Sequence, residues 1–316
     1  MLGTLLLLLA ALIWGSAFVA QSEGAEIIDP FTFDTMRCIV SGVILLPLGL
    51  VINTIRSKRD GTPVKGILEA FAYGSNVKML IIGGTICGAI LSMAIYFQQV
   101  GIGLTTSAKA GFITALYILG VPLIGLFSKK KVSPILWVCI AVALLGFYML
   151  SMNPAENLLF GLGDLMLLLC AICFSFHIVT VDRFSPSVSG ILLSALQFWV
   201  CGIISAVCMF IFEKPDLSAI IDCVIPILYA GGMSGAIAYT LQIVAQRFTE
   251  PTIASLAMSF ESVFAAVSGW IILNEALNRR EIIGCILIFA AVVIAQLPSG
   301  KIGRCKSMSA VNKAVE

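Results

Sequence analysis

Four ionisable side chains lie within long apolar stretches of this 316-residue chain and are the first candidates for chemistry: Arg37, Lys109, His177 and Glu261. A charged side chain at the centre of a membrane helix costs about 2.5–3.5 kcal/mol on insertion scales. Each of the four is therefore a candidate for binding a solute or for carrying a proton.

Glu261 lies near the middle of its apolar stretch, and Ser255, Ser259 and Ser262 form a polar stripe on a neighbouring helix face. Because apolar surroundings disfavour a charged carboxylate, Glu261 could bind and release a proton, or it could pair with the amine of a substrate. The alternative is a structural role, in which a paired Glu261 holds helices together.

Arg37 follows Asp34 by three residues, a spacing that places both side chains on one face of a helix. The two charges could simply neutralise each other. Alternatively, Arg37 presents its planar guanidinium to a substrate carboxylate, which matches its geometry. The sequence leaves both interpretations open.

Lys109 and His177 also have two interpretations each. Lys109 stands near the end of its stretch, where a long basic side chain commonly extends to the membrane surface; the alternative is substrate binding or gating. His177 is the single histidine, so a metal site is not expected. A packed, hydrogen-bonded histidine is the default, and a proton relay with Glu261 is the alternative.

Aromatic and amide side chains form a second group of candidates. Aromatic walls with a few hydrogen-bonding groups are typical of sites for amphipathic small molecules. The residues expected to line such a central cavity are Trp14, Tyr96, Gln98, Tyr117, Gln197, Trp199, Tyr239 and Gln242.

The composition places all these residues in a membrane. Hydrophobic residues make up 59% of the chain and charged residues 11%, whereas a soluble domain has roughly 45–50% and about 25%. The short loops leave no room for a soluble catalytic domain, and a net charge of +2 does not indicate nucleic-acid binding. Cys170 and Cys173 form a CxxC inside an apolar run and are interpreted as packing residues. We expect no catalytic residue, metal or cofactor.

Ten apolar runs approach the length of about 20 residues that a helix needs to cross a bilayer. Only helices satisfy their own backbone hydrogen bonds in lipid, and the runs do not alternate as barrel strands do. We therefore expect an all-α membrane protein with ten transmembrane helices, at residues 2–20, 31–53, 79–101, 107–127, 133–151, 161–180, 188–212, 222–245, 251–273 and 281–298.

The basic residues predict the orientation of these spans, because cytoplasmic loops are enriched in Lys and Arg. With the N-terminus inside, most Lys and Arg lie on inner segments, whereas Lys214, Arg279 and Arg280 lie outside. An even number of spans then places both termini in the cytoplasm, and we expect a multi-pass protein of the cytoplasmic membrane.

The two halves of the chain resemble each other. Gly84xxxGly88 in the third span corresponds to Gly231xxxGly235 in the eighth, and the fourth and ninth spans align without gaps. This divides the chain into a first repeat (1–152), a second repeat (153–298) and a basic cytoplasmic tail (299–316). Five spans is an odd number, so the repeats insert in opposite senses, an arrangement typical of secondary transporters with a binding site at the repeat interface.

In order and spacing, these residues resemble the ten-span EamA-type group of the drug/metabolite transporter superfamily. The resemblance rests on Ala11-Leu-Ile-Trp14-Gly15-Ser16, Arg37, Lys109 to Thr114, Pro122, Gly161-Leu-Gly-Asp164, Phe260-Glu261 and Asn274-Glu275. It implies a carrier of small organic molecules, often an exporter of amino acids or related metabolites. The chain departs from the pattern at Lys130, where the first repeat often has a glutamate, and at Ser262, where a proline commonly stands.

Two other functions stay open at this point. A receptor or scaffold without transport activity would share the same composition. Gly161-Leu-Gly-Asp164 also matches the GxGD pattern of intramembrane aspartyl proteases, with Asp34 as the second aspartate. The internal repeat gives a simpler explanation of the motif. It marks the start of the second repeat, where Asp164 would lie at a helix N-terminus, which favours a negative charge. The expected partners are a small-molecule substrate and the lipid bilayer, with no nucleic acid, and a homodimer is left open.

Overall fold

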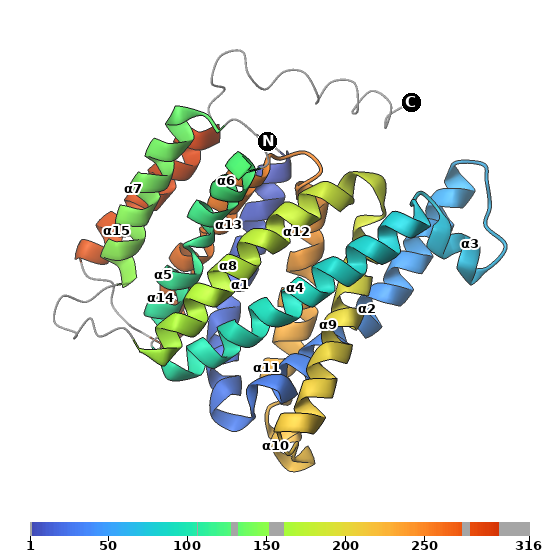
Figure 1. Cartoon of the computed structure of the whole chain (residues 1–316), viewed down its shortest axis with the longest axis horizontal. Coiled ribbons are helices and arrows are strands. Elements are labelled where there is room, and N and C mark those ends of the chain that lie inside the picture. Colours follow the sequence, from blue (N-terminus) through green and yellow to red (C-terminus); the bar gives the residue numbers. More distant parts are fainter. Residues whose placement is uncertain (1, 106, 128–131, 152–160, 274–278, 297–316) are drawn as a thin grey trace.

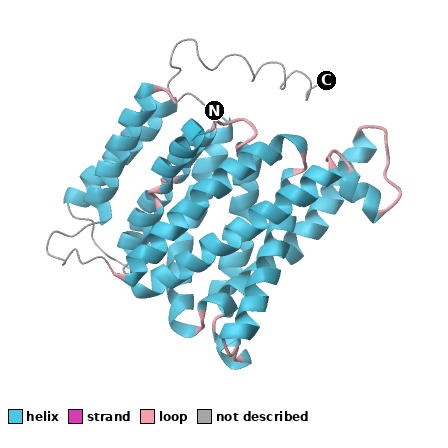
Figure 2. Cartoon of the chain, in the orientation of Figure 1, coloured by secondary structure: helices cyan, strands magenta, loops and turns pink. Residues whose placement is uncertain are grey.

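The computed structural model describes residues 2–105, 107–127, 132–151, 161–273 and 279–296, and the regular elements in these ranges are all helical (Figures 1 and 2). The first half contains α1 (Leu2–Ile27), α2 (Pro30–Arg59), α3 (Ile67–Ala72), α4 (Val77–Leu104), α5 (Ser107–Thr114), α6 (Tyr117–Phe127) and α7 (Pro134–Ser151). The second half contains α8 (Leu162–Phe184), the 3₁₀ turn η1 (Ser185–Ser187), α9 (Gly190–Phe212), α10 (Leu217–Asp222), α11 (Val224–Leu228), the π-helix η2 (Tyr229–Ala238), α12 (Tyr239–Ala245), α13 (Pro251–Met258), α14 (Glu261–Leu273) and α15 (Arg279–Gln296).

Within the described ranges, eight helical segments are long and apolar enough to cross a membrane, and α7 contributes a shorter apolar helix. This confirms the expected all-helical, multi-pass membrane protein. The helices extend beyond some of the expected boundaries. For example, α1 continues to Ile27 rather than ending near residue 20, because Gln21 and Gly24 face the protein interior and are buried. Lys130, Glu275 and the basic tail lie outside the described residues.

Two of the expected spans are broken near their middle. The fourth is divided into α5 and α6 at residues 115–116, and the ninth is divided into α13 and α14 at residues 259–260. At both breaks, backbone N–H groups bond three residues back, as in a 3₁₀ turn. Ala115 corresponds to Phe260 in the gapless alignment of the two spans. The breaks therefore occupy matching places in the two halves.

The eighth expected span also departs from a regular α-helix. It is built from α11, η2 and α12, and η2 is a π-helix of 10 residues that contains Gly231, Gly232 and Gly235. Its counterpart α4 is an unbroken α-helix of 28 residues. Glycine-rich backbone adapts to unusual helical geometry, and π-helical segments often occur at functional sites.

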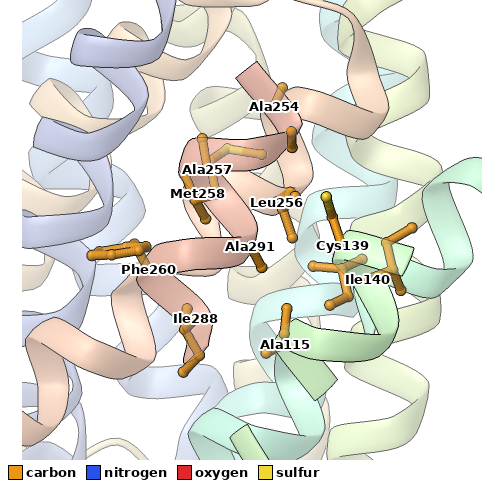
Figure 3. Close-up of a cluster of buried hydrophobic side chains, with 14 of the residues drawn as sticks. Ala115, Cys139, Ile140, Ala254, Leu256, Ala257, Met258, Phe260, Ile288 and Ala291 are labelled. Atoms are coloured by element: carbon orange, nitrogen blue, oxygen red, sulfur yellow. The ribbon is translucent and has the colours of Figure 1, made fainter. Parts of the chain in front are cut away.

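The long helices pair across the two halves. Along the diagonal of Figure 1, α4 lies beside α8, while α2 packs on α9; α7 and α15 pair at one edge of the molecule. The largest apolar cluster lies where α7 and α15 cover the broken spans. Figure 3 shows Leu256 and Met258 of this cluster gathered with Ile140 and Ile288. This packing supports the break that immediately precedes Glu261.

A glycine on η2 allows its close approach to α2. A Cβ added at Gly231 would lie 2.6 Å from the Cβ of Val40 and 2.7 Å from the backbone oxygen of Arg37, whereas at Gly232 the nearest atom would be Ile44 Cδ1 at 3.8 Å. We expect Gly231→Ala to lower the free energy of unfolding by about 1–3 kcal/mol through overpacking. Gly232→Ala is the matched control and should be nearly neutral. Thermal unfolding in detergent micelles measures both, and equal stability of the two variants would contradict this packing.

Candidate functional site

A buried cavity lies between the two halves of the bundle. It is lined from α1, α2, α4 and α6 in the first half and from α8, η2, α12, α13 and α14 in the second. The lining residues are Trp14, Phe18, Gln21, Arg37, Gln98, Tyr117, Phe174, Ile178, Ser234, Tyr239, Gln242, Met258 and Glu261. Seven of the eleven residues predicted to bind substrate or to line the cavity, Glu261 and Arg37 among them, are therefore brought together in one place.

Arg37 forms the positive part of the cavity wall and is 5% exposed. Its Nη2 lies 2.8 Å from Asp34 Oδ1, and its Nη1 donates to Gln21 Oε1 at 3.0 Å. Gln99 Nε2 in turn donates to the backbone oxygen of Gln21 at 2.9 Å. Two side-chain partners, Asp34 on the same helix and Gln21 on α1, thus hold the guanidinium in a defined orientation.

Glu261 forms the acidic part of the wall and is 6% exposed. It opens α14 directly after the break, where the helix N-terminus favours a carboxylate. Tyr117 opens α6 after the matching break, and its hydroxyl donates to Glu261 Oε1 at 3.3 Å. Gly15 allows α1 to approach this point, because an added Cβ would lie 2.6 Å from the backbone oxygen of Glu261. Both broken spans therefore meet at one carboxyl group.

Aromatic rings form the wall between these two charged groups. The rings of Trp14 and Tyr239 meet edge to face with centroids 4.9 Å apart, and Tyr117 packs against Phe174 at 6.4 Å. Three buried polar atoms of lining residues have neither a hydrogen-bond partner nor an ion-pair partner among the described residues: Trp14 Nε1, Arg37 Nε and Gln242 Oε1. Buried polar groups are normally paired, so these two donors and one acceptor are candidates for binding a solute or ordered water.

The cavity is narrow in this structure. The centre of a water molecule can occupy about 40 Å³ of it, which is room for only a few waters. An organic metabolite therefore requires the helices around the cavity to move apart before it can enter.

The other predicted residues are not part of the described lining. Trp199 does not line the cavity, and its indole ring lies beside Gly42 of α2. Tyr96 is stacked on Phe31 with ring centroids 4.0 Å apart and does not line the cavity. Gln197 is buried against His177, with Gln197 Oε1 3.0 Å from His177 Nε2. The side chain of Lys109 lies outside the described part of the structure. The serine stripe near Glu261 bonds to backbone carbonyl groups rather than lining the cavity.

Sequence reasoning missed six lining residues: Phe18, Gln21, Phe174, Ile178, Ser234 and Met258. Gln21 and Phe18 follow Trp14 by seven and four residues, so helical spacing alone could have placed them on the same face. Ile178 and Met258 are apolar residues in apolar runs and carried no comparable signal.

His177 is fully buried, contacts Gln197, and is separate from the cavity lining. We expect His177→Gln to reduce stability by about 1–3 kcal/mol, because a buried partner loses its hydrogen bond. Any acceleration of transport by a pH gradient should stay within about twofold of the unmodified protein if the role of His177 is packing. Flux measurements in proteoliposomes test this, and loss of the acceleration would instead favour the proton relay with Glu261.

The aspartates of the GxGD alternative have separate partners. Asp34 pairs with Arg37, and Asp164 Oδ2 accepts from the backbone N–H of Gly161 at 2.9 Å in the first turn of α8. The described residues contain no group of three or more His, Cys, Asp or Glu that could hold a metal ion. Neither observation favours a hydrolytic centre.

A multi-span helical bundle with a buried polar and aromatic cavity between its halves has the architecture of a membrane transporter. Residues 1–152 and 161–296 match the EamA-like transporter family, and the chain belongs to this family. This confirms the family resemblance seen in the sequence. The protein is a transporter and not an enzyme, so the protease alternative is excluded.

Its relatives are themselves described only as transporters. The chain is 28% identical over 298 residues to an uncharacterized transporter of Archaeoglobus fulgidus, covering 92% of this chain and 84% of that one. It is 23% identical to the uncharacterized transporter YoaV of Bacillus subtilis, covering 89% and 92%. A solved crystal structure with 18% identity aligns with a TM-score of 0.70 over 93% of this chain and 96% of that chain. At that identity the likeness shows the fold alone.

Proposed function

We propose that this protein is a secondary transporter that exports small organic metabolites, amino acids or related amphipathic solutes, across the cytoplasmic membrane by alternating access. The observation that carries the proposal is the placement of Arg37 and Glu261 in one narrow, aromatic-walled cavity between the two halves. A guanidinium suits a carboxylate, a carboxyl group suits an amine or a proton, and the rings between them suit an apolar body.

The proposed mechanism uses ten spans in two inverted repeats, with both termini in the cytoplasm. The packing supports this symmetry, because each contact between two helices has a matching contact between their counterparts in the other repeat. α4 packs along α8, and η2 with α12 packs along α1; the broken pair α5 and α6 lies on α8, and the pair α13 and α14 lies on α1. Broken spans at a repeat interface are typical of secondary transporters, where they bind the solute and permit alternating access.

Proton exchange through Glu261 is the proposed source of energy. As the solute leaves toward the outside, a proton would enter and bind the carboxyl group, which faces the cavity and has a single hydrogen bond from Tyr117 among the described residues. With the proton bound, the cavity would then return to its cytoplasm-facing conformation and release the proton there. This cycle requires that solute and proton bind to Glu261 in turn rather than together.

Efflux from proteoliposomes tests direction and coupling. Vesicles are loaded with a panel of labelled amino acids and sugars, and the external pH is then lowered. We expect faster efflux of one solute class, because protons enter in exchange. Efflux that is saturable but indifferent to the gradient would contradict proton coupling and indicate facilitated diffusion.

A further inference from the structure

The connection between α2 and α4 (residues 56–78) is a basic segment on the molecular surface. Its five basic side chains are all exposed: Arg56, Lys58, Arg59, Lys65 and Lys78. The same segment contains two acidic residues, Asp60 and Glu69. The connection therefore carries a net positive charge, concentrated at the last turn of α2.

Hydrogen bonds hold this connection in a defined position. Asn53, buried in α2, donates from Nδ2 to the backbone oxygens of Ala70 at 2.9 Å and Tyr73 at 3.2 Å. The hydroxyl of Tyr73 donates to Asp60 Oδ2 at 2.6 Å. These bonds tie the C-terminal part of α3 to α2, so the charges and the short helix form one surface.

The short helix α3 turns apolar side chains away from the protein. Ala70 is 3% exposed and Phe71 packs on a buried cluster, but Ile67 is 73% exposed and Leu68 is 84% exposed. Figure 1 shows α3 at the edge of the molecule opposite α7 and α15. Two large apolar side chains thus stand beside five basic ones without being covered by any described residue.

We propose that the connection between α2 and α4 binds the headgroups of anionic phospholipids, with Ile67 and Leu68 inserted among the acyl chains. Basic residues next to the end of a membrane helix attract anionic lipids, and apolar residues on an interfacial helix reach the boundary between headgroups and chains. Just before the basic turn, α2 exposes Ile55, which is 62% exposed and suited to lipid contact. This places the connection at the membrane surface.

Other anionic ligands fit the surface less well. Free phosphate would match the basic side chains but would leave Ile67 and Leu68 in water. A phospholipid matches both features, because one molecule carries a negative headgroup and apolar chains. The inference depends only on membrane insertion and is independent of which solute the protein transports.

Photo-crosslinking from the exposed helix tests this proposal. p-Benzoylphenylalanine is introduced in place of Leu68, the full chain is placed in vesicles of phosphatidylcholine and phosphatidylglycerol at three to one, and the crosslinked lipids are identified by mass spectrometry. Each nearby basic residue favours anionic lipid by about fivefold. We therefore expect the ratio of phosphatidylglycerol to phosphatidylcholine among the crosslinked lipids to be about fivefold or more above the ratio in the vesicle.

Variants that remove basic residues show which part of the chain causes the lipid enrichment. Lys58→Gln, Arg59→Gln and Lys65→Gln together should return the crosslinked lipids to within about twofold of the bulk ratio. The matched control removes three charges from the C-terminal tail by Lys301→Gln, Arg304→Gln and Lys306→Gln, and it should keep the enrichment. A probe in place of Phe210, which is 73% exposed on α9, should report the bulk ratio.

Several results would overturn the proposal. These are crosslinking at the bulk lipid ratio, enrichment that survives removal of the three charges in the connection, equal loss of enrichment in the tail control, and crosslinking to a second copy of the chain instead of lipid. Size-exclusion chromatography of each variant shows that the comparison is made between folded proteins.

Discussion

Replacing Glu261 with Gln should abolish the acceleration of efflux by a pH gradient while leaving expression normal. Glutamine keeps the shape of the side chain and an oxygen that can accept from the Tyr117 hydroxyl, but it cannot take up a proton. The measurement is efflux from proteoliposomes at matched protein density, with and without acid outside. A variant that keeps the full acceleration would refute coupling through Glu261.

Two neighbouring variants serve as controls for Glu261→Gln. Ser262→Ala removes a hydroxyl that bonds the backbone oxygen of Gly111 and should leave the acceleration unchanged. Tyr117→Phe removes the hydrogen bond to the carboxyl group without removing the titrating group. It should preserve coupling but shift the pH at which the acceleration is half-maximal, which a lost packing contact would not do.

Replacing Arg37 with Gln should destabilise the protein by about 3–5 kcal/mol, because Asp34 is then left as a buried carboxylate without its charged partner. Combining Arg37→Gln with Asp34→Asn should restore most of that stability, since neither side chain is then charged. Thermal unfolding in micelles measures both variants. A single variant as stable as the double variant would contradict a buried ion pair.

The same double variant separates the two interpretations of Arg37. If Arg37 only neutralises Asp34, the stable double variant transports normally. If Arg37 binds a substrate carboxylate, the double variant is folded but inactive, and Arg37→Lys loses at least about tenfold in apparent affinity because an ammonium cannot form paired parallel hydrogen bonds. We expect a double variant that is folded but inactive, as substrate binding by Arg37 requires. The unpaired Nε of Arg37 among the described residues supports it.

The membrane location and helical class were predictable from the sequence because lipid imposes a single requirement on the backbone, and long apolar runs satisfy it. The ion pair of Asp34 with Arg37 followed from helical spacing alone. The burial of Glu261 likewise followed from its place in an apolar run. In each of these features, the local sequence alone determines the structure.

Features that depend on contacts between helices were not predictable in the same way. The breaks at residues 115–116 and 259–260 have no proline or glycine at the broken positions, so propensity favoured continuous spans. Tyr96 and Tyr117 looked alike as amphipathic aromatics, but only the packing of the halves directs Tyr117 into the cavity and Tyr96 onto Phe31. The role of Gln21 in holding Arg37 also requires knowing that α1 lies beside α2.

We propose that the cavity between the two halves carries a small organic solute across the membrane. Counterflow in proteoliposomes tests it most directly: vesicles loaded with an unlabelled amino acid or sugar are diluted into a trace of the same labelled compound, without any ion gradient. We expect transient, saturable accumulation of one solute class, and loss of this accumulation in the folded Arg37→Gln, Asp34→Asn double variant. Accumulation that is unchanged in this variant would contradict the proposed cavity as the binding site.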